Sequence, residues 1–134
     1  MMLNIKTGYG GITQFPNSEI VVFASSLRRL ESMGHAFVFT DRHALLANAR
    51  FYRQLSDLKA LDWAIWQARD FRRDPDDPEK LERYQAEALV RGLLPTEALL
   101  GLVCYNSQSE RELTSQVTER GMALGVHARP GWYF

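Results

Sequence analysis

The sequence predicts an α+β fold of short strands and helices, and residues 19–40 and 101–120 carry this prediction. Residues 19–24 (EIVVFA) form a short β-branched and aromatic run that is typical of a strand. A helical pattern follows, and then a second strand-like apolar run at residues 36–40. Residues 101–105 (GLVCY) indicate another strand, and residues 107–120 indicate a helix. With 134 residues, 46% hydrophobic and 24% charged, the chain is expected to bury a sizeable core and to form a single domain, residues 1–134.

The two helices have start and stop signals. Ser25 and Ser26 offer an N-cap for the first helix, and Gly34 ends it. Ser109 and Glu112 resemble a capping box in the second helix, and Gly121 closes it.

Composition and periodicity assign the remaining segments. Residues 8–19 are rich in glycine, proline and asparagine and predict a loop. Apolar residues recur at helical spacing through residues 44–73, which predict helix with a break in the middle. The acidic residues 70–79 predict an exposed turn in which Pro78 is well placed as a first helical residue. A short strand is expected at residues 126–129.

Composition excludes several classes of function. The net charge is zero, so only a local patch could bind nucleic acid or a membrane. The single cysteine, Cys104, lies in an apolar run and is expected to be buried, in a reducing, cytoplasmic setting. No signal peptide, membrane span, metal-ligand spacing, Walker loop or dinucleotide fingerprint is present, and Gly8, Gly10 and Gly11 predict a loop rather than a phosphate cradle.

Glu87 is the strongest catalytic candidate because it opens the apolar run 88–90. A carboxylate at the edge of a core can have its charge and direction tuned by burial. The alternative is that Glu87 simply ends a helix face. Periodicity leaves residues 86–90 open between helix and strand.

A basic and aromatic segment precedes Glu87 in the chain. Arg50 and Arg53 would be neighbours on a helix, and Phe51 and Tyr52 stand between them. Arginines with interleaved aromatic residues can hold single-stranded nucleic acid by phosphate contact and base stacking. The alternative is a solvated helix face with a core-facing tyrosine.

His43 is the best placed of the three histidines. It follows the end of a predicted strand, with Asp41 and Arg42 beside it. An N-cap at Asp41 for a following helix is the competing interpretation of this segment.

Several of these motifs, in order and spacing, resemble the DarT family of DNA ADP-ribosyltransferase toxins. They are residues 37–44 (FVFTDRHA), 50–52 (RFY), 55–58 (LSDL), 62–63 (DW), 85–90 (QAEALV) and 129–134 (RPGWYF). The resemblance covers nearly the whole chain.

The resemblance implies an ADP-ribosyltransferase fold of mixed small sheets with flanking helices, in which NAD, the co-substrate, lies in a cleft between two small sheets. It implies transfer of ADP-ribose to thymidine or guanosine in single-stranded DNA, without a metal. Glu87 matches the family's catalytic glutamate and begins a strand, and residues 46–87 match the substrate-recognition loop. The expected DNA-binding residues are His43, Arg50, Tyr52, Arg53 and Tyr84. The expected reaction class is glycosyl transfer and nucleotidyl transfer, and a macrodomain antitoxin is the expected partner.

The resemblance also carries an expectation about the chain's beginning. The family's amino-terminal His-Ile-Thr-like NAD motif and an arginine that follows it are not in this sequence, so we expect the carboxy-terminal portion of a DarT domain, lacking the first elements. No measurable transferase activity is expected from the 134 residues alone. The residues that bind NAD stay unassigned. The alternative function is a catalytically inactive remnant that binds single-stranded DNA.

Overall fold

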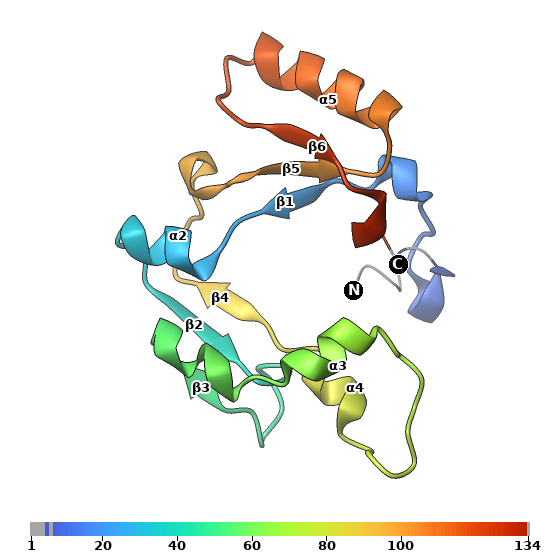
Figure 1. The fold of residues 1–134 in the computed structure, drawn as a ribbon, viewed down its shortest axis with the longest axis vertical. Coiled ribbons are helices and arrows are strands. Elements are labelled where there is room, and N and C mark those ends of the chain that lie inside the picture. Colours follow the sequence, from blue (N-terminus) through green and yellow to red (C-terminus); the bar gives the residue numbers. More distant parts are fainter. Residues whose placement is uncertain (1–4, 6, 134) are drawn as a thin grey trace. The chain divides into compact units, whose positions relative to one another are not determined.

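The computed structural model describes residue 5 and residues 7–133. The chain forms two compact units, one made of Met1–Ser26 with Pro95–Phe134 and the other of Leu27–Leu94 (Figure 1). The single domain expected from the length stays a prediction. Among the described residues no helix is long and apolar enough to cross a bilayer.

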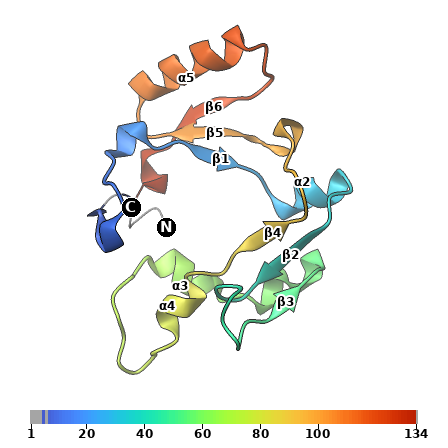
Figure 2. The ribbon, with the colours of Figure 1, turned by 180° about the vertical axis from the view of Figure 1, so that it is seen from behind.

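The first unit is built on a three-stranded sheet in the order β1 (Val22–Ala24), β5 (Gly101–Cys104), β6 (Val126–Ala128). β1 and β5 pair antiparallel, whereas β5 and β6 pair parallel. The parallel pair requires a crossover, and α5 (Ser107–Glu119) provides it and lies along β6 (Figure 2).

Burial explains the apolar run in β5. Leu102, Val103 and Cys104 are all buried, and β5 is the central strand of its sheet. Burial also raises the pKa of the Cys104 thiol, so the prediction of a buried small hydrophobe is confirmed. The hydroxyl of the buried Tyr133 lies 2.7 Å from the carbonyl oxygen of Ile20 and 2.9 Å from that of Val103. This contact holds the end of the chain on the sheet.

Short 3-10 turns join these elements. In the first unit they are Tyr9–Gly11, Asn17–Glu19, Thr96–Ala98 and Pro130–Trp132. The loop predicted for residues 8–19 is therefore confirmed.

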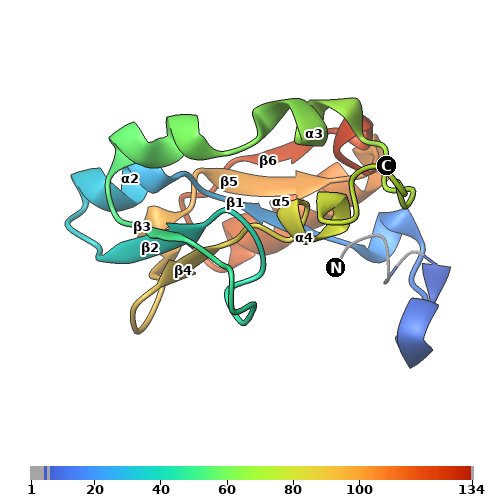
Figure 3. The ribbon, with the colours of Figure 1, turned by 90° about the horizontal axis from the view of Figure 1, so that it is seen from below.

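The second unit has its own sheet, in the order β3 (Phe51–Tyr52), β2 (Phe37–Thr40), β4 (Ala88–Val90), with both pairs antiparallel (Figure 3). α2 (Leu27–Ser32) packs beside β2. Gly34 follows α2 with a φ of 75°, a left-handed conformation that favours glycine, so the predicted helix stop is confirmed.

Two helices and a 3-10 segment complete the second unit: Leu55–Ala60, α3 (Trp63–Ala68) and α4 (Lys80–Arg83). Asp62 caps α3 by accepting a hydrogen bond from the amide of Ile65 at 3.3 Å. The α4 helix is only four residues long, so side-chain contacts rather than helix propensity must hold it in place.

The helix predicted over residues 44–73 is wrong. Residues 51–52 form strand β3, residues 55–60 are 3-10 helix and only residues 63–68 are α-helical. The apolar spacing in this segment comes from several short elements that each turn a few residues toward the core. Local periodicity cannot distinguish that from one helix.

Two predicted helix-start signals are also wrong. α5 is capped by Asn106, whose side chain accepts from the amide of Ser109 at 2.9 Å, so Ser109 and Glu112 do not form a capping box. Pro78 is not a first helical residue, because α4 begins at Lys80. The strands predicted near β1, β2, β5 and β6 and the helices near α2 and α5 are confirmed, with ends shifted by up to three residues.

Candidate active site

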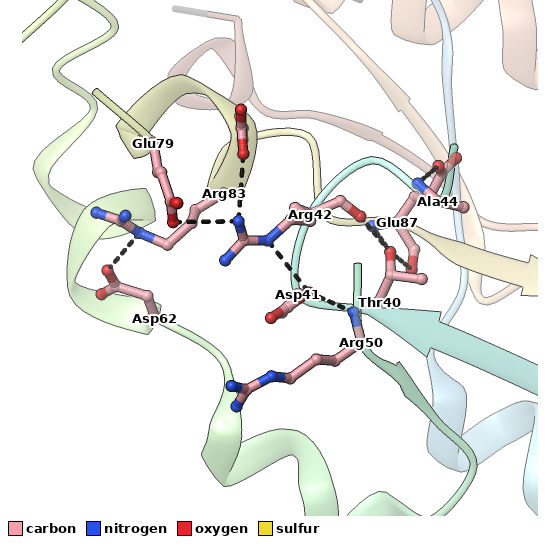
Figure 4. A network of polar contacts seen from close by, with 10 residues as sticks. Thr40, Asp41, Arg42, Ala44, Arg50, Asp62, Glu79, Arg83 and Glu87 are labelled. Carbon is pink, nitrogen blue, oxygen red and sulfur yellow. Dashed lines mark hydrogen bonds and ion pairs between the residues drawn. The ribbon is translucent and has the colours of Figure 1, made fainter. Parts of the chain in front are cut away.

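The carboxylate of Glu87 is held at the start of β4 by a main-chain donor. The amide of Ala44 donates to Oε1 of Glu87 at 2.8 Å (Figure 4). The Glu87 side chain is 35% exposed, and its Oε2 has no hydrogen-bond partner among the described residues. One oxygen is therefore fixed while the other is available, as a group that must meet a substrate requires. The reading in which Glu87 ends a helix face is wrong.

Thr40, the last residue of β2, fixes the backbone of Glu87. The amide of Thr40 donates to the carbonyl of Glu87 at 2.9 Å, and the amide of Glu87 donates to the hydroxyl oxygen of Thr40 at 3.2 Å. The same hydroxyl donates to the carbonyl of Arg42 at 2.5 Å. Thr40 is only 1% exposed, so its side of these bonds is buried.

His43 lies beside the Glu87 carboxylate. Nδ1 of His43 is 3.6 Å from Oε1 of Glu87, but it also accepts from the amide of Leu45 at 3.2 Å. The distance to Glu87 is longer than a hydrogen bond. The imidazole is 43% exposed.

A cluster of charges holds the turn after β2. Nη1 of Arg42 contacts Glu79 at 3.1 Å and Glu82 at 3.2 Å, both beside or within α4. Nε of Arg42 lies 3.5 Å from Asp41, too far for a hydrogen bond, and has no hydrogen-bond partner in the described residues. The Arg42 side chain is only 12% exposed. Burial disfavours its charge, yet the carboxylates raise the pKa of the guanidinium.

Asp41 is not a helix N-cap. Its Oδ1 accepts from the amide of Arg50 at 3.0 Å and so closes the loop between β2 and β3 (Figure 4). The next element after Asp41 is strand β3, so no helix begins at this residue. Because Arg50 uses only its main chain here, its exposed side chain stays available.

Arg50 and Arg53 flank strand β3 instead of sharing a helix face. Both side chains are exposed, and Phe51 between them is 54% exposed. Residues three apart on an extended chain point to opposite faces, so the two arginines are not side-by-side neighbours. Tyr52 stacks on the buried Phe39, with ring centroids 5.4 Å apart. One face of the Tyr52 ring is therefore used inside the unit.

Tyr84 directly follows α4, and its side chain contacts α3 and not the Glu87 carboxylate. Its hydroxyl donates to the carbonyl of Ile65 at 2.5 Å, and its ring packs on Phe71 at 4.6 Å. Arg83, next to it, pairs with Asp62 at 3.2 Å. These contacts hold the two helices together. A role for Tyr84 in DNA binding stays a prediction.

One hollow of about 430 Å³ lies in the loop before α4, lined by Arg73, Asp74, Pro75, Asp77, Pro78 and Leu81. None of these residues contacts the Glu87 carboxylate, so the hollow is not part of the candidate active site. Within the described part of the chain, no group of three or more His, Cys, Asp or Glu side chains could hold a metal ion.

Comparison with known proteins identifies the family of this chain. The model of the family described as "ssDNA thymidine ADP-ribosyltransferase, DarT" matches residues 1–134. The chain belongs to the DarT family. It is 47% identical over 134 residues to a DNA ADP-ribosyl transferase of Escherichia coli O127:H6, and this match covers all of the chain and 62% of the relative. The chain thus spans about three fifths of that DarT relative's length.

Solved DarT structures show the same fold. Thermus sp. 2.9 DarT in complex with ADP-ribosylated ssDNA matches with a TM-score of 0.86 and 32% identity over 99% of this chain and 63% of that one. Thermus sp. 2.9 DarT in complex with NAD⁺ matches with a TM-score of 0.84 at the same identity, over 99% of this chain and 66% of that one. The predicted α+β, ADP-ribosyltransferase-like fold is confirmed.

Sequence reasoning missed the groups that hold Glu87. The donor is the main-chain amide of Ala44, which no side-chain motif reveals. The sequence predicts Thr40 only as the end of a strand and gives no sign of the bonds that its hydroxyl makes. Of the acidic partners of Arg42, Glu79 was predicted only to end an exposed turn and Glu82 was assigned no contact, because an ion pair between residues this far apart in the chain leaves no local signal.

Proposed function

We propose that this DarT-family chain carries the catalytic glutamate of a DNA ADP-ribosyltransferase. The reaction transfers ADP-ribose from NAD to a base, thymidine, in single-stranded DNA. The observation that carries the proposal is the half-exposed Glu87 carboxylate, fixed through one oxygen by the Ala44 amide, in a chain that matches the family along its whole length. The choice of thymidine rests on the family's description alone.

The chemistry suits a fixed carboxylate. When the bond between ribose and nicotinamide breaks, positive charge develops on the ribose carbon, and a preorganised carboxylate stabilises that charge. The free oxygen of Glu87 could also orient a ribose hydroxyl or accept the proton of the attacking base. The bond that breaks is glycosidic, so the reaction is glycosyl transfer, and the expected class of nucleotidyl transfer is not supported.

The DNA would bind along the exposed residues around β3. Arg50 and Arg53 offer two guanidinium groups whose side chains face solvent, and Phe51 offers an exposed ring between them. Phosphate contact together with stacking is how single strands are held without a duplex. His43, at 43% exposure beside Glu87, is the residue best placed to meet the base itself.

The remaining partners follow from the same proposal. NAD is the co-substrate. A macrodomain antitoxin that removes the modification is the partner implied by the family. The cytoplasm is the proposed location, because NAD and DNA are both found there.

The test is transfer of label from NAD to oligonucleotides. The assay is run on the 134-residue chain and on a chimera that adds the part of the E. coli relative not matched by this chain, because the match covers 62% of that relative. We expect transfer by the chimera to single-stranded oligonucleotides that contain thymidine, and none to oligonucleotides of the other three bases. If the chimera transfers label to none of the four bases, the proposal is rejected.

The inactive single-stranded-DNA-binding remnant would behave differently in the same assay. It would bind the oligonucleotide without consuming NAD, and its affinity would fall with salt by a slope of about −0.7 per phosphate contact. No observation in the structure favours this alternative, since the Glu87 carboxylate is present and held.

A further inference from the structure

The hydroxyl of Thr40 occupies an unusual place in the sheet of the second unit. Phe39 pairs with Ala88 in the antiparallel ladder, so Thr40 and Glu87 stand opposite each other one step further on. A hydrogen-bonded antiparallel pair exchanges two main-chain bonds. Here the amide of Thr40 donates to the carbonyl of Glu87, but the amide of Glu87 donates to the side chain of Thr40 instead of its carbonyl. The side chain thus supplies the second bond of the pair.

The same hydroxyl also shapes the turn that carries Ala44. It donates to the carbonyl of Arg42 at 2.5 Å, two residues beyond Thr40. Two residues further on, the Ala44 amide reaches Oε1 of Glu87. Figure 4 shows Thr40 and Ala44 on the two sides of Glu87, both pointing toward it. One buried oxygen therefore fixes the backbone of Glu87 and the turn whose amide holds its carboxylate.

We propose that Thr40 is a positioning residue for the reaction, which acts by directing the Glu87 carboxylate through the amide of Ala44. This inference rests on the proposed function of Glu87. Thr40 touches no substrate, because it is 1% exposed. Its hydroxyl is the acceptor for the Glu87 amide and the donor to the Arg42 carbonyl, so its removal leaves both main-chain groups without that partner.

The decisive variants are Thr40→Val and Thr40→Ser. Valine keeps the shape of threonine and removes the hydroxyl, whereas serine keeps the hydroxyl. A misplaced catalytic group costs about 10²-fold in rate. In the active chimera we expect Thr40→Val to lower kcat about 10²-fold while the KM for NAD stays within about twofold, because binding does not involve Thr40. Thr40→Ser should retain most of kcat although it loses a buried methyl group. That result would show that the hydroxyl, and not packing, is what matters for kcat.

A second measurement tests the geometry without activity. Hydrogen exchange of the Ala44 amide is followed by NMR in the 134-residue chain and its variants. We expect the amide to be protected in the wild type and in Thr40→Ser, and to exchange faster in Thr40→Val. Thr114→Val is the matched control, because the exposed Thr114 hydroxyl donates to the carbonyl of Glu110 within α5, in the other unit. It should change neither measurement.

The two measurements separate failure of this inference from failure of the proposed function. Wild-type kcat and wild-type protection of Ala44 in Thr40→Val would overturn the inference. If the wild-type chimera transfers no label, the proposed function fails, and hydrogen exchange alone decides the positioning claim. If Thr40→Val does not fold, Ala44→Pro removes the same amide donor and leaves Thr40 intact, and an unchanged kcat in that variant would overturn the inference.

Discussion

The amide of Ala44 and the carboxylate of Glu87 meet at 2.8 Å although 43 residues separate them in the chain. The contact links the turn after β2 to the start of β4. A main-chain donor is well suited to hold a carboxylate, because it has no rotamers to lose and leaves the second oxygen free. The direction of the candidate catalytic group is therefore set by the sheet of the second unit.

Glu87→Gln should separate the charge of this group from its shape. Glutamine keeps an oxygen that can accept from Ala44 but has no negative charge to stabilise the developing cation. We expect ADP-ribosyl transfer by the chimera to fall about 10²–10³-fold, the scale for losing one electrostatic stabiliser. Glu31→Gln, an exposed change on α2, is the control and should keep full activity. Full activity in Glu87→Gln would remove Glu87 from the mechanism.

Arg50→Ala and Arg53→Ala should weaken binding of single-stranded DNA. The Asp41 bond uses the main chain of Arg50, so the alanine variant keeps the loop closed. Each variant should reduce the slope of log affinity against log salt by about 0.7 if it removes one phosphate contact. Arg28→Ala, an exposed change on α2, should leave affinity and slope unchanged. Equal slopes in all three variants would show that the DNA lies elsewhere.

The sequence predicts the parts of the fold that depend on local signals. Of the six strands in the part of the chain that the structure describes, four follow from short apolar runs, and the helices α2 and α5 follow from helical spacing and glycine stops such as Gly34 and Gly121; these predictions are confirmed. Strand β4 followed from the family resemblance, since periodicity left residues 86–90 open. Strand β3 was missed because Phe51 and Tyr52 become a strand only by pairing with β2.

The candidate site also has a part that the sequence predicts and a part that it does not. Glu87 could be singled out because a carboxylate before an apolar run is visible in the sequence. Its support could not, because the Ala44 amide looks the same in every sequence and its partner is distant along the chain. Asp41 shows the same limit. Its carboxylate closes a loop nine residues long, where the sequence suggested a local helix cap.

Arg42→Ala should destabilise the second unit. The side chain is 12% exposed and pairs with Glu79 and Glu82, so its removal leaves carboxylates without a cation in a partly dry site. Because Glu79 and Glu82 are 53% and 36% exposed, we expect a loss of about 1–2 kcal/mol in the free energy of unfolding, below the value for a fully buried pair. Urea titration monitored by circular dichroism measures it. Arg28→Ala should have no effect.

The second unit should lose stability in acid. The hydrogen bonds from Arg83 lower the pKa of the Asp77 carboxyl, and those from Arg72 and then Lys80 lower the pKa of Asp70. A pKa lowered by folding adds stability above the ordinary value of about 3.9, and that stability is lost as pH falls through the folded value.

Thermal midpoints between about pH 6 and pH 2 test this dependence, and Asp77→Asn should flatten part of the decline. Asp76→Asn is the control, because no salt bridge involves Asp76 in the described residues. Since the pairs are exposed, added salt should weaken the effect. A decline of equal steepness in Asp77→Asn and wild type would contradict the assignment.

Gly101→Ala should destabilise the first unit. A Cβ at Gly101 would lie 2.8 Å from the carbonyl oxygen of Gly125, a main-chain atom that also accepts from the amide of Leu102 at 2.8 Å. The clash can be relieved only by moving the entry to β6 away from β5. We expect a loss of about 1–3 kcal/mol in the free energy of unfolding, the range for overpacking. Gly131→Ala is the matched control, because an added Cβ there meets nothing within 4 Å. Equal stabilities of the two variants in urea would show that β6 moves aside without strain.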